Sequence, residues 1–99
     1  MNRKSLQTLG LAQVAGGLIS GEDQVLKAIK NKQAKLVLLA RDAGVNTQKK
    51  LTDKCQTYQI PLIEYYSRQE LTQALGKKRL ICCFIDNGFA KLWQQNEEQ

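Results

Sequence analysis

The residues best suited to chemistry in this chain gather at the start of one expected helix. Residues 20–30 read Ser-Gly-Glu-Asp-Gln-Val-Leu-Lys-Ala-Ile-Lys. The first backbone N–H groups of a helix have no partner within the helix and carry partial positive charge, so they can bind the acceptor atoms of a ligand. Gly21 leaves room for a ligand to approach the backbone closely. We therefore expect function at this turn.

Two carboxylates, Glu22 and Asp23, occupy the first turn of that helix, and Lys27 and Lys30 lie further along its outer side. The acids would repel a phosphate but suit base edges. An unpaired or sheared guanine offers N1–H and N2–H donors to a carboxylate, while its O6 and N7 accept from a lysine. Alternatively, both acids simply complement the helix dipole. The residue types favour neither interpretation over the other.

Basic residues form three groups along the chain, and each could be only a solvated face. The first group follows the helix at 22–31 and the third precedes the last expected strand, so both can border one groove. The second group lies on the outer face of its own helix, remote from Gly21. The groups are Lys27, Lys30, Lys32 and Lys35; Lys49, Lys50 and Lys54; and Lys77, Lys78 and Arg79.

The chain has few residues that are suited to catalysis. The chain has no Gly-x-x-x-x-Gly-Lys-Ser/Thr loop, no Gly-x-Gly-x-x-Gly fingerprint and no histidine to serve as the usual base for a Ser or Cys nucleophile. Asp42, at the carboxyl end of an apolar run, stands where active sites of open sheets often lie, but Asp commonly caps or turns the chain. We predict a non-enzymatic protein without a cofactor, and keep an enzyme using Asp42 as a minor alternative.

The cysteines argue against a metal site. Cys82 and Cys83 are neighbours in an expected strand, so their side chains point to opposite faces. Without histidine or a Cys-x-x-Cys motif, zinc binding has little support, and buried reduced thiols are the usual state of such residues. We predict that these two residues and Cys55 are reduced and structural.

Length and charge limit the class of protein. The 99 residues suit a single domain over 1–99, and fifteen Lys and Arg against nine Asp and Glu give a net charge of +6. Two of the acids, Glu97 and Glu98, lie at the C-terminus, where chain ends can be disordered. Such a basic chain attracts polyanions. The sequence has neither a run long enough to span a membrane nor a secretory signal, so we expect a cytoplasmic protein that binds no membrane. We also predict a monomer.

Helical and strand patterns alternate along the chain. Continuous apolar runs such as Leu36–Ala40 are typical of strands covered on both faces, and helices between them predict a three-layer α/β/α sandwich around a small, mostly parallel four-stranded sheet. Ser67 and Glu70 form a capping-box pattern. Helices are expected at about 4–15, 22–31, from Asn46 or Thr47 to before Pro61, from Ser67 to Gly76 and after Asp86, and strands at 18–19, 35–40, 62–65 and 80–85.

Several segments together resemble one family. Residues 20–29 and 34–43, then Ile-Pro-Leu-Ile at 60–63, Ser-Arg-Gln-Glu-Leu at 67–71 and Ala-Leu-Gly at 74–76, are similar in content and order to the archaeal and eukaryotic kink-turn-binding ribosomal protein superfamily. The resemblance is greatest to its short bacterial YlxQ-type members and covers nearly the whole chain. It implies an α/β/α sandwich that binds kink-turn RNA, where tandem sheared G·A pairs flank a sharp bend.

The family motif runs Gly, a small residue, Asn, Glu, two variable positions and Lys. By resemblance its functional positions are Gly21, Asp23, Gln24 and Lys27, of which the Gly and the Lys match. Glu22 replaces the small residue, and Asp and Gln replace Asn and Glu, which moves the carboxylates.

The family's second contact is an apolar loop before the last strand that packs on an extruded nucleotide. The corresponding loop here, residues 76–80, is shorter and more basic. Leu80 could still make the apolar contact, while Arg79 could stack on a base or bind phosphate.

The leading hypothesis is a structured-RNA binder related to ribosome-associated kink-turn proteins, with ribosomal RNA one possible target. The alternative is an adaptor that docks a protein. The predicted RNA-binding residues are Gly21, Glu22, Asp23, Gln24, Lys27, Lys30, Lys78, Arg79 and Leu80.

Overall fold

The computed structural model describes residues 3–97, and helices and strands alternate through them. The strands are β1 (Leu18–Ser20), β2 (Leu36–Leu39), β3 (Leu62–Ile63) and β4 (Ile81–Phe84). The helices are α1 (Arg3–Val14), α2 (Glu22–Lys30), α3 (Val45–Thr57), α4 (Arg68–Leu75) and α5 (Asn87–Glu97).

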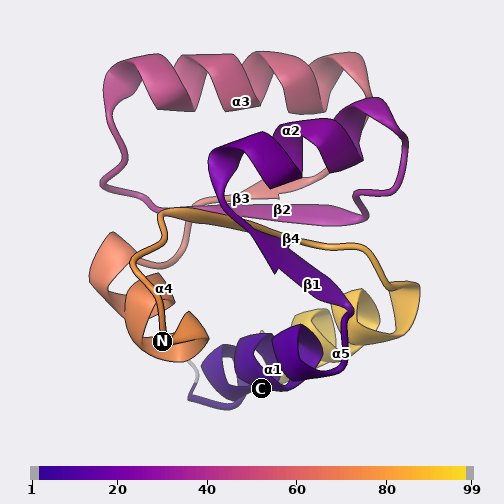
Figure 1. Cartoon of the computed structure of the whole chain (residues 1–99), viewed down its shortest axis with the longest axis vertical. Coiled ribbons are helices and arrows are strands. Elements are labelled where there is room, and N and C mark those ends of the chain that lie inside the picture. The colour runs from indigo at the N-terminus through magenta and orange to yellow at the C-terminus, as the bar shows by residue number, and fades with distance from the viewer. Residues whose placement is uncertain (1–2, 98–99) are drawn as a thin grey trace.

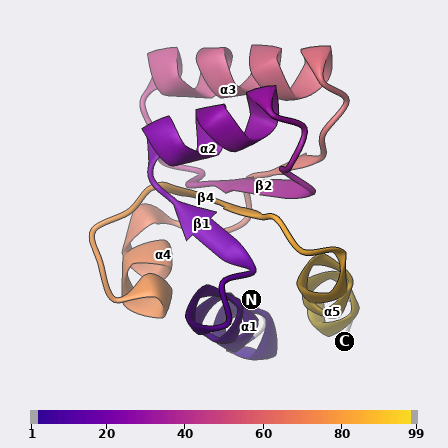
Figure 2. The same ribbon diagram turned by 45° about the vertical axis from the view of Figure 1, so that its right-hand side comes forward.

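The helices cover both faces of the sheet. In Figures 1 and 2, α2 and α3 lie on one face, and α1, α4 and α5 lie on the other. Every residue of β2 and of β4 is buried, as expected for strands covered on both sides. The predicted three-layer α/β/α sandwich with four strands is confirmed.

The direction of the strands differs from the prediction of a mostly parallel sheet. The order is β1-β4-β2-β3, and β4 runs antiparallel to both of its neighbours, so only the β2–β3 pair is parallel. A continuous apolar run indicates burial on both faces and carries no information about direction, which explains the error. The consequence is that β1, β2 and β3 all point the same way, and β4 alone is reversed.

Local capping signals place the helix ends. The capping box at α4 is present in both directions: Ser67 N–H donates to Glu70 Oε1 at 2.9 Å, and Glu70 N–H donates to Ser67 Oγ at 3.2 Å. The helix ends at Gly76, which adopts a left-handed φ of 72°. At α5, Asp86 Oδ1 accepts from Gly88 N–H at 2.9 Å. The third helix begins at Val45 rather than after a cap at residue 46 or 47, because extended Gly44 precedes it and no side chain caps it.

The three cysteines are free and buried, as predicted. Burial raises the pKa of the Cys55 thiol to about 11 and that of the Cys83 thiol to about 12, with a smaller contribution to the latter from nearby Cys55. For Cys82, burial and then the neighbouring Cys83 raise the pKa. These thiols are therefore protonated at neutral pH. Among residues 3–97 no group of three His, Cys, Asp or Glu side chains is arranged to hold a metal ion.

The layer of α1, α4 and α5 is joined by an aromatic and hydroxyl network. Trp93 Nε1–H donates to Tyr66 Oη at 3.0 Å, and the Ser5 hydroxyl is hydrogen-bonded to the same oxygen. Glu97, expected in a disordered C-terminus, belongs to α5 and accepts from Tyr66 Oη at 3.3 Å, while Glu98 lies outside the described residues. No helix within residues 3–97 is long and apolar enough to cross a membrane.

Candidate functional site

The strand directions bring three helix starts to one edge of the sheet. Because β1, β2 and β3 are parallel to one another, the helices that follow them, α2, α3 and α4, all begin at the same edge. The reversed strand β4 starts there too, directly after the basic loop at 76–80. A groove of about 310 Å³ lies between these segments, and its lining residues are Gly21, Glu22, Thr47, Arg68, Thr72, Lys78, Arg79, Leu80 and Ile81.

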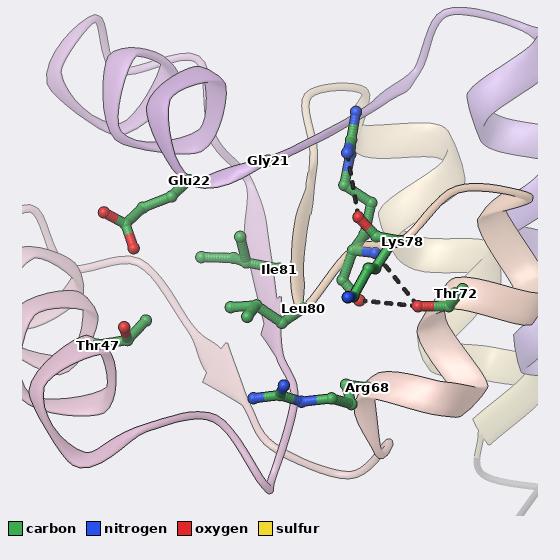
Figure 3. Close-up of a pocket in the computed structure, with 9 residues that line it drawn as sticks. Gly21, Glu22, Thr47, Arg68, Thr72, Lys78, Leu80 and Ile81 are labelled. Carbon is green, nitrogen blue, oxygen red and sulfur yellow. Dashed lines mark hydrogen bonds between the residues drawn. The ribbon is translucent and has the colours of Figure 1, made fainter.

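The groove has an apolar floor and charged walls (Figure 3). Leu80 and Ile81 lie between Glu22 and Thr47 on one side and Arg68 on the other. The three basic side chains of the lining outnumber its one carboxylate. The starts of α2 and α3, whose N-cap residues make no side-chain hydrogen bond, add partial positive charge. The arrangement can therefore hold an anion at its walls and an apolar face of a ligand on its floor.

Gly21 connects β1 to α2 with a backbone that favours glycine. Its φ of 98° lies in the region that side chains rarely adopt, and its N–H donates to Ile81 O at 3.0 Å. A Cβ here would lie 3.8 Å from Arg79 Nε, which is ordinary contact. The glycine is thus required for the turn rather than for space, and the turn places the start of α2 beside Arg79.

Arg79 is held by side chains from two other elements. Its Nε donates to Ser20 Oγ at 2.9 Å, and its Nη1 donates to the carbonyl of Lys78 at 3.1 Å. Thr72 of α4 fixes the backbone, since its hydroxyl accepts from Arg79 N–H at 3.2 Å and donates to Arg79 O at 3.3 Å. The guanidinium therefore has a fixed position at the groove wall.

Arg68 is positioned by Asp42, the residue on which the minor enzymatic alternative depends. Asp42 Oδ1 accepts from Arg68 N–H at 2.9 Å, and Arg68 Nη2 donates to Asp42 O at 3.4 Å. Asp42 thus caps the start of α4. Glu70 is anchored in the same turn: burial opposes its ionisation, but hydrogen bonds from Ser67 and Arg41 outweigh this and hold its pKa below the ordinary value.

Lys50 corrects one expectation about the basic groups. The sequence placed it on the outer face of α3, remote from the start of α2, yet its Nζ lies 3.0 Å from Glu22 Oε2. The helices α2 and α3 run side by side on the same face of the sheet, so the first turn of α2 faces the second turn of α3 (Figure 1). Lys49 instead lines a separate cavity with Val45 and Glu64.

Only some of the predicted RNA-binding residues line the groove. Gly21, Glu22, Lys78, Arg79 and Leu80 line it. Four predicted residues of α2 do not line it and are exposed: Asp23, Gln24, Lys27 and Lys30.

The first basic group, which could have bordered the groove, contributes no lining residue to it. Lys32 lines a different cavity, with Tyr58 and Ile60, beyond the carboxyl ends of α2 and α3. Sequence reasoning missed Thr47, Arg68, Thr72 and Ile81, although the capping box already placed Arg68 first in its helix.

Comparisons with known proteins give a consistent result. Residues 3–93 match the sequence profile of the Ribosomal protein L7Ae/L30e/S12e/Gadd45 family. The chain is 45% identical over 89 residues to the RNA-binding protein YlxQ of Enterococcus faecium, covering 90% of this chain and 86% of that protein. It is 49% identical over 83 residues to the RNA-binding protein YlxQ of Bacillus subtilis, covering 83% of each.

Solved structures support the same assignment. A Bacillus halodurans protein described as having unknown function superposes with a TM-score of 0.88 at 44% identity, covering 97% of this chain and 98% of that one. The Giardia lamblia 15.5kD RNA binding protein shares the fold, with a TM-score of 0.79 at 16% identity and coverage of 94% and 81%. With its described elements, its profile match and these relatives, the chain belongs to the ribosomal protein L7Ae/L30e/S12e/Gadd45 family.

Proposed function

We propose that this chain is a small, non-enzymatic RNA-binding protein that recognises a bent or internally looped RNA, such as a kink-turn. One observation carries the proposal: three helix starts, three basic side chains and an apolar floor converge on a single groove in a member of this family. The two relatives named as RNA-binding proteins, at 45% and 49% identity, support it.

The groove offers each chemical part of an irregular nucleotide a suitable partner. Arg68, Lys78 and Arg79 can bind phosphate oxygens, and Arg79 is already held in place by Ser20. Leu80, which is partly exposed, offers an apolar surface to a base, and the buried Ile81 lies beneath it. Regular A-form duplex hides its base edges and stacked faces, so these contacts favour RNA with unpaired bases.

The groups that could serve an enzyme have other tasks. Asp42 caps α4 through Arg68 N–H, and the buried thiols of Cys55 and Cys83 have pKa values raised to about 11 and about 12. These facts support a binding role without a cofactor. The proposal includes one RNA-binding domain that acts as a cytoplasmic monomer, with ribosomal RNA one possible target.

The test compares a kink-turn RNA with a regular duplex of the same length over a range of salt concentrations. We expect the protein to bind the kink-turn more tightly, with the preference retained at high salt, since charge contacts weaken as salt rises and base contacts do not. Equal affinity for both RNAs at every salt concentration would leave only charge-driven binding. Absence of RNA binding, with retention of a protein partner after nuclease treatment, would favour the adaptor instead.

A further inference from the structure

A second groove follows the free edge of β3. The strand order β1-β4-β2-β3 gives β3 one neighbour, β2, and leaves its other edge without a partner strand. Two cavities, of about 520 Å³ and 480 Å³, lie between this edge and α3, and both are lined by Thr52 and Glu64. Glu64 also lines a third hollow, together with Tyr65. The three adjoin one another, and we call this surface, from Pro61 and Leu62 past Glu64 to Tyr65, the β3 groove.

The backbone of β3 offers hydrogen bonds at this edge. Pro61 O accepts from Val37 N–H at 2.9 Å, so Pro61 faces β2. Successive residues of a strand direct their N–H and C=O groups to alternate edges, so Leu62 directs both of its groups away from β2. No strand within residues 3–97 pairs with that edge. Leu62 therefore offers one donor and one acceptor to an extended segment, which is how peptides add to the edge of a sheet.

Two exposed side chains give the β3 groove apolar and aromatic surface. Val45, at the start of α3, is 65% exposed, and Tyr65 is 50% exposed, so both are open to a partner. The Tyr65 ring is stacked on Trp93, with ring centroids 6.2 Å apart, which holds it in position. A fixed and exposed aromatic ring attracts a cationic side chain to its face.

The charge of the β3 groove is opposite to that of the whole chain. Three carboxylates and two basic side chains line it, which are Asp53, Glu64 and Glu97, and Arg41 and Lys49. Arg41 is already paired with Glu70, with Nη1 3.1 Å from Oε1. Within residues 3–97, neither Asp53 nor Glu64 forms an ion pair. On a chain of net charge +6, this surface repels phosphate and attracts cationic groups.

We propose that the β3 groove binds an extended segment of a partner protein that carries lysine or arginine. The segment pairs with Leu62 at the strand edge and places a basic side chain between the Tyr65 ring and the Glu64 carboxylate, where cation–π attraction and an ion pair act together. The proposal does not depend on the RNA-binding function. The β3 groove shares no lining residue with the groove of Lys78 and Arg79, so one chain can hold an RNA and a protein at the same time.

The experiment titrates the full-length protein with the synthetic peptide Val-Lys-Val-Arg-Val-Lys and follows the amide shifts by NMR. We expect the largest changes at Leu62, Glu64 and Tyr65, and much weaker binding of the acidic peptide Val-Glu-Val-Asp-Val-Glu. Glu64→Gln and Tyr65→Leu should each lower the affinity for the basic peptide about two- to fivefold, because each removes one attraction to its cationic side chain. Circular dichroism of each variant verifies its folding.

Two lysine variants are the matched controls, since each removes one positive charge. Lys49→Ala removes it from within the β3 groove and should strengthen binding of the basic peptide, whereas Lys91→Ala removes it from the exposed side of α5 and should have no effect. Shift changes centred away from β3, equal affinity for the basic and acidic peptides, or no effect of Glu64→Gln and Tyr65→Leu would each overturn the proposal. Kink-turn RNA binding, measured separately, should be the same in Glu64→Gln as in the wild type. Absence of RNA binding by the wild type would overturn the proposed function and leave the β3 groove standing.

Discussion

The Nε of Arg79 donates to Ser20 Oγ at 2.9 Å, which ties the basic loop before β4 to the end of β1. The two residues are 59 positions apart in the chain, and Gly21 follows Ser20 directly at the turn into α2. This hydrogen bond and the one from Nη1 to Lys78 O at 3.1 Å fix the guanidinium in place. Ser20 is therefore a positioning residue, while Arg79 is the one expected to touch RNA.

Removing the Ser20 hydroxyl should weaken RNA binding through Arg79 alone. We expect Ser20→Ala to raise the Kd for kink-turn RNA about two- to tenfold, since an ordered side chain loses its orienting hydrogen bond. Arg79→Ala should cost more and reduce the salt slope of binding by about one unit, the value for one phosphate contact. In the Arg79→Ala background, Ser20→Ala should have no further effect. Additive losses in the double variant would show that Ser20 acts independently.

Lys27 is predicted to contribute base specificity although it lies outside the groove lining. If it reaches a guanine O6 or N7 beside the start of α2, Lys27→Ala should cost roughly 1–3 kcal/mol on kink-turn RNA and flatten discrimination among base changes. Lys49→Ala removes the same charge at a distance from that turn and should cost less. Equal losses in affinity and specificity for the two variants would show that the start of α2 is a solvated helix end that does not recognise bases.

Restoring the family motif tests the two positions at which this chain departs from it. Asp23 and Gln24 are exposed in the first turn of α2, so Asp23→Asn with Gln24→Glu should leave folding unchanged. We expect the double variant to prefer kink-turn RNA over duplex more strongly than the wild type does. An unchanged or reduced preference would mean that this chain recognises RNA by other contacts.

The buried thiols give a prediction about pH. Burial raises the pKa of Cys55 to about 11 and of Cys83 to about 12, so both bind their protons more tightly in the folded chain than in the unfolded one. Their contribution to stability is complete below the ordinary thiol pKa of about 8.5 and is lost as pH rises through the folded values. The free energy of unfolding should therefore fall between about pH 9 and pH 12.

A thiol reagent checks the same account directly. At pH 8 the folded protein should react slowly, and unfolding in guanidinium should release three reactive thiols per chain, one for each buried cysteine. Rapid reaction of the folded protein would contradict the burial of these side chains.

Local chemistry explains which features the sequence could predict. The capping box of Ser67 and Glu70 and the cap at Asp86 depend on atoms a few residues apart, and both are present. Burial on both faces of β2 and β4 followed from their apolar runs. The direction of the strands could not be predicted from these runs, because a continuous apolar run suits a parallel strand and an antiparallel central strand such as β4 equally well.

The groove required tertiary information for the same reason. Gly21 and Arg79 were expected together, but Thr47 and Thr72 enter only because α3 and α4 begin at the same edge as α2. The contact of Lys50 with Glu22 joins positions 28 apart and depends on how two neighbouring helices are aligned. The sequence around each of these two residues does not predict how α2 and α3 are aligned.

The most direct test of the account maps the RNA contact on the protein itself. In an NMR titration with kink-turn RNA, we expect the largest amide shift changes at Gly21, Glu22, Arg68, Leu80 and Ile81, around the groove. Amides on the exposed sides of α1 and α5, which lie on the opposite face of the sheet from α2, should change little (Figure 2). Changes concentrated on α1 and α5, or changes of equal size with kink-turn RNA and with regular duplex, would contradict the claim that this groove is the RNA-binding site.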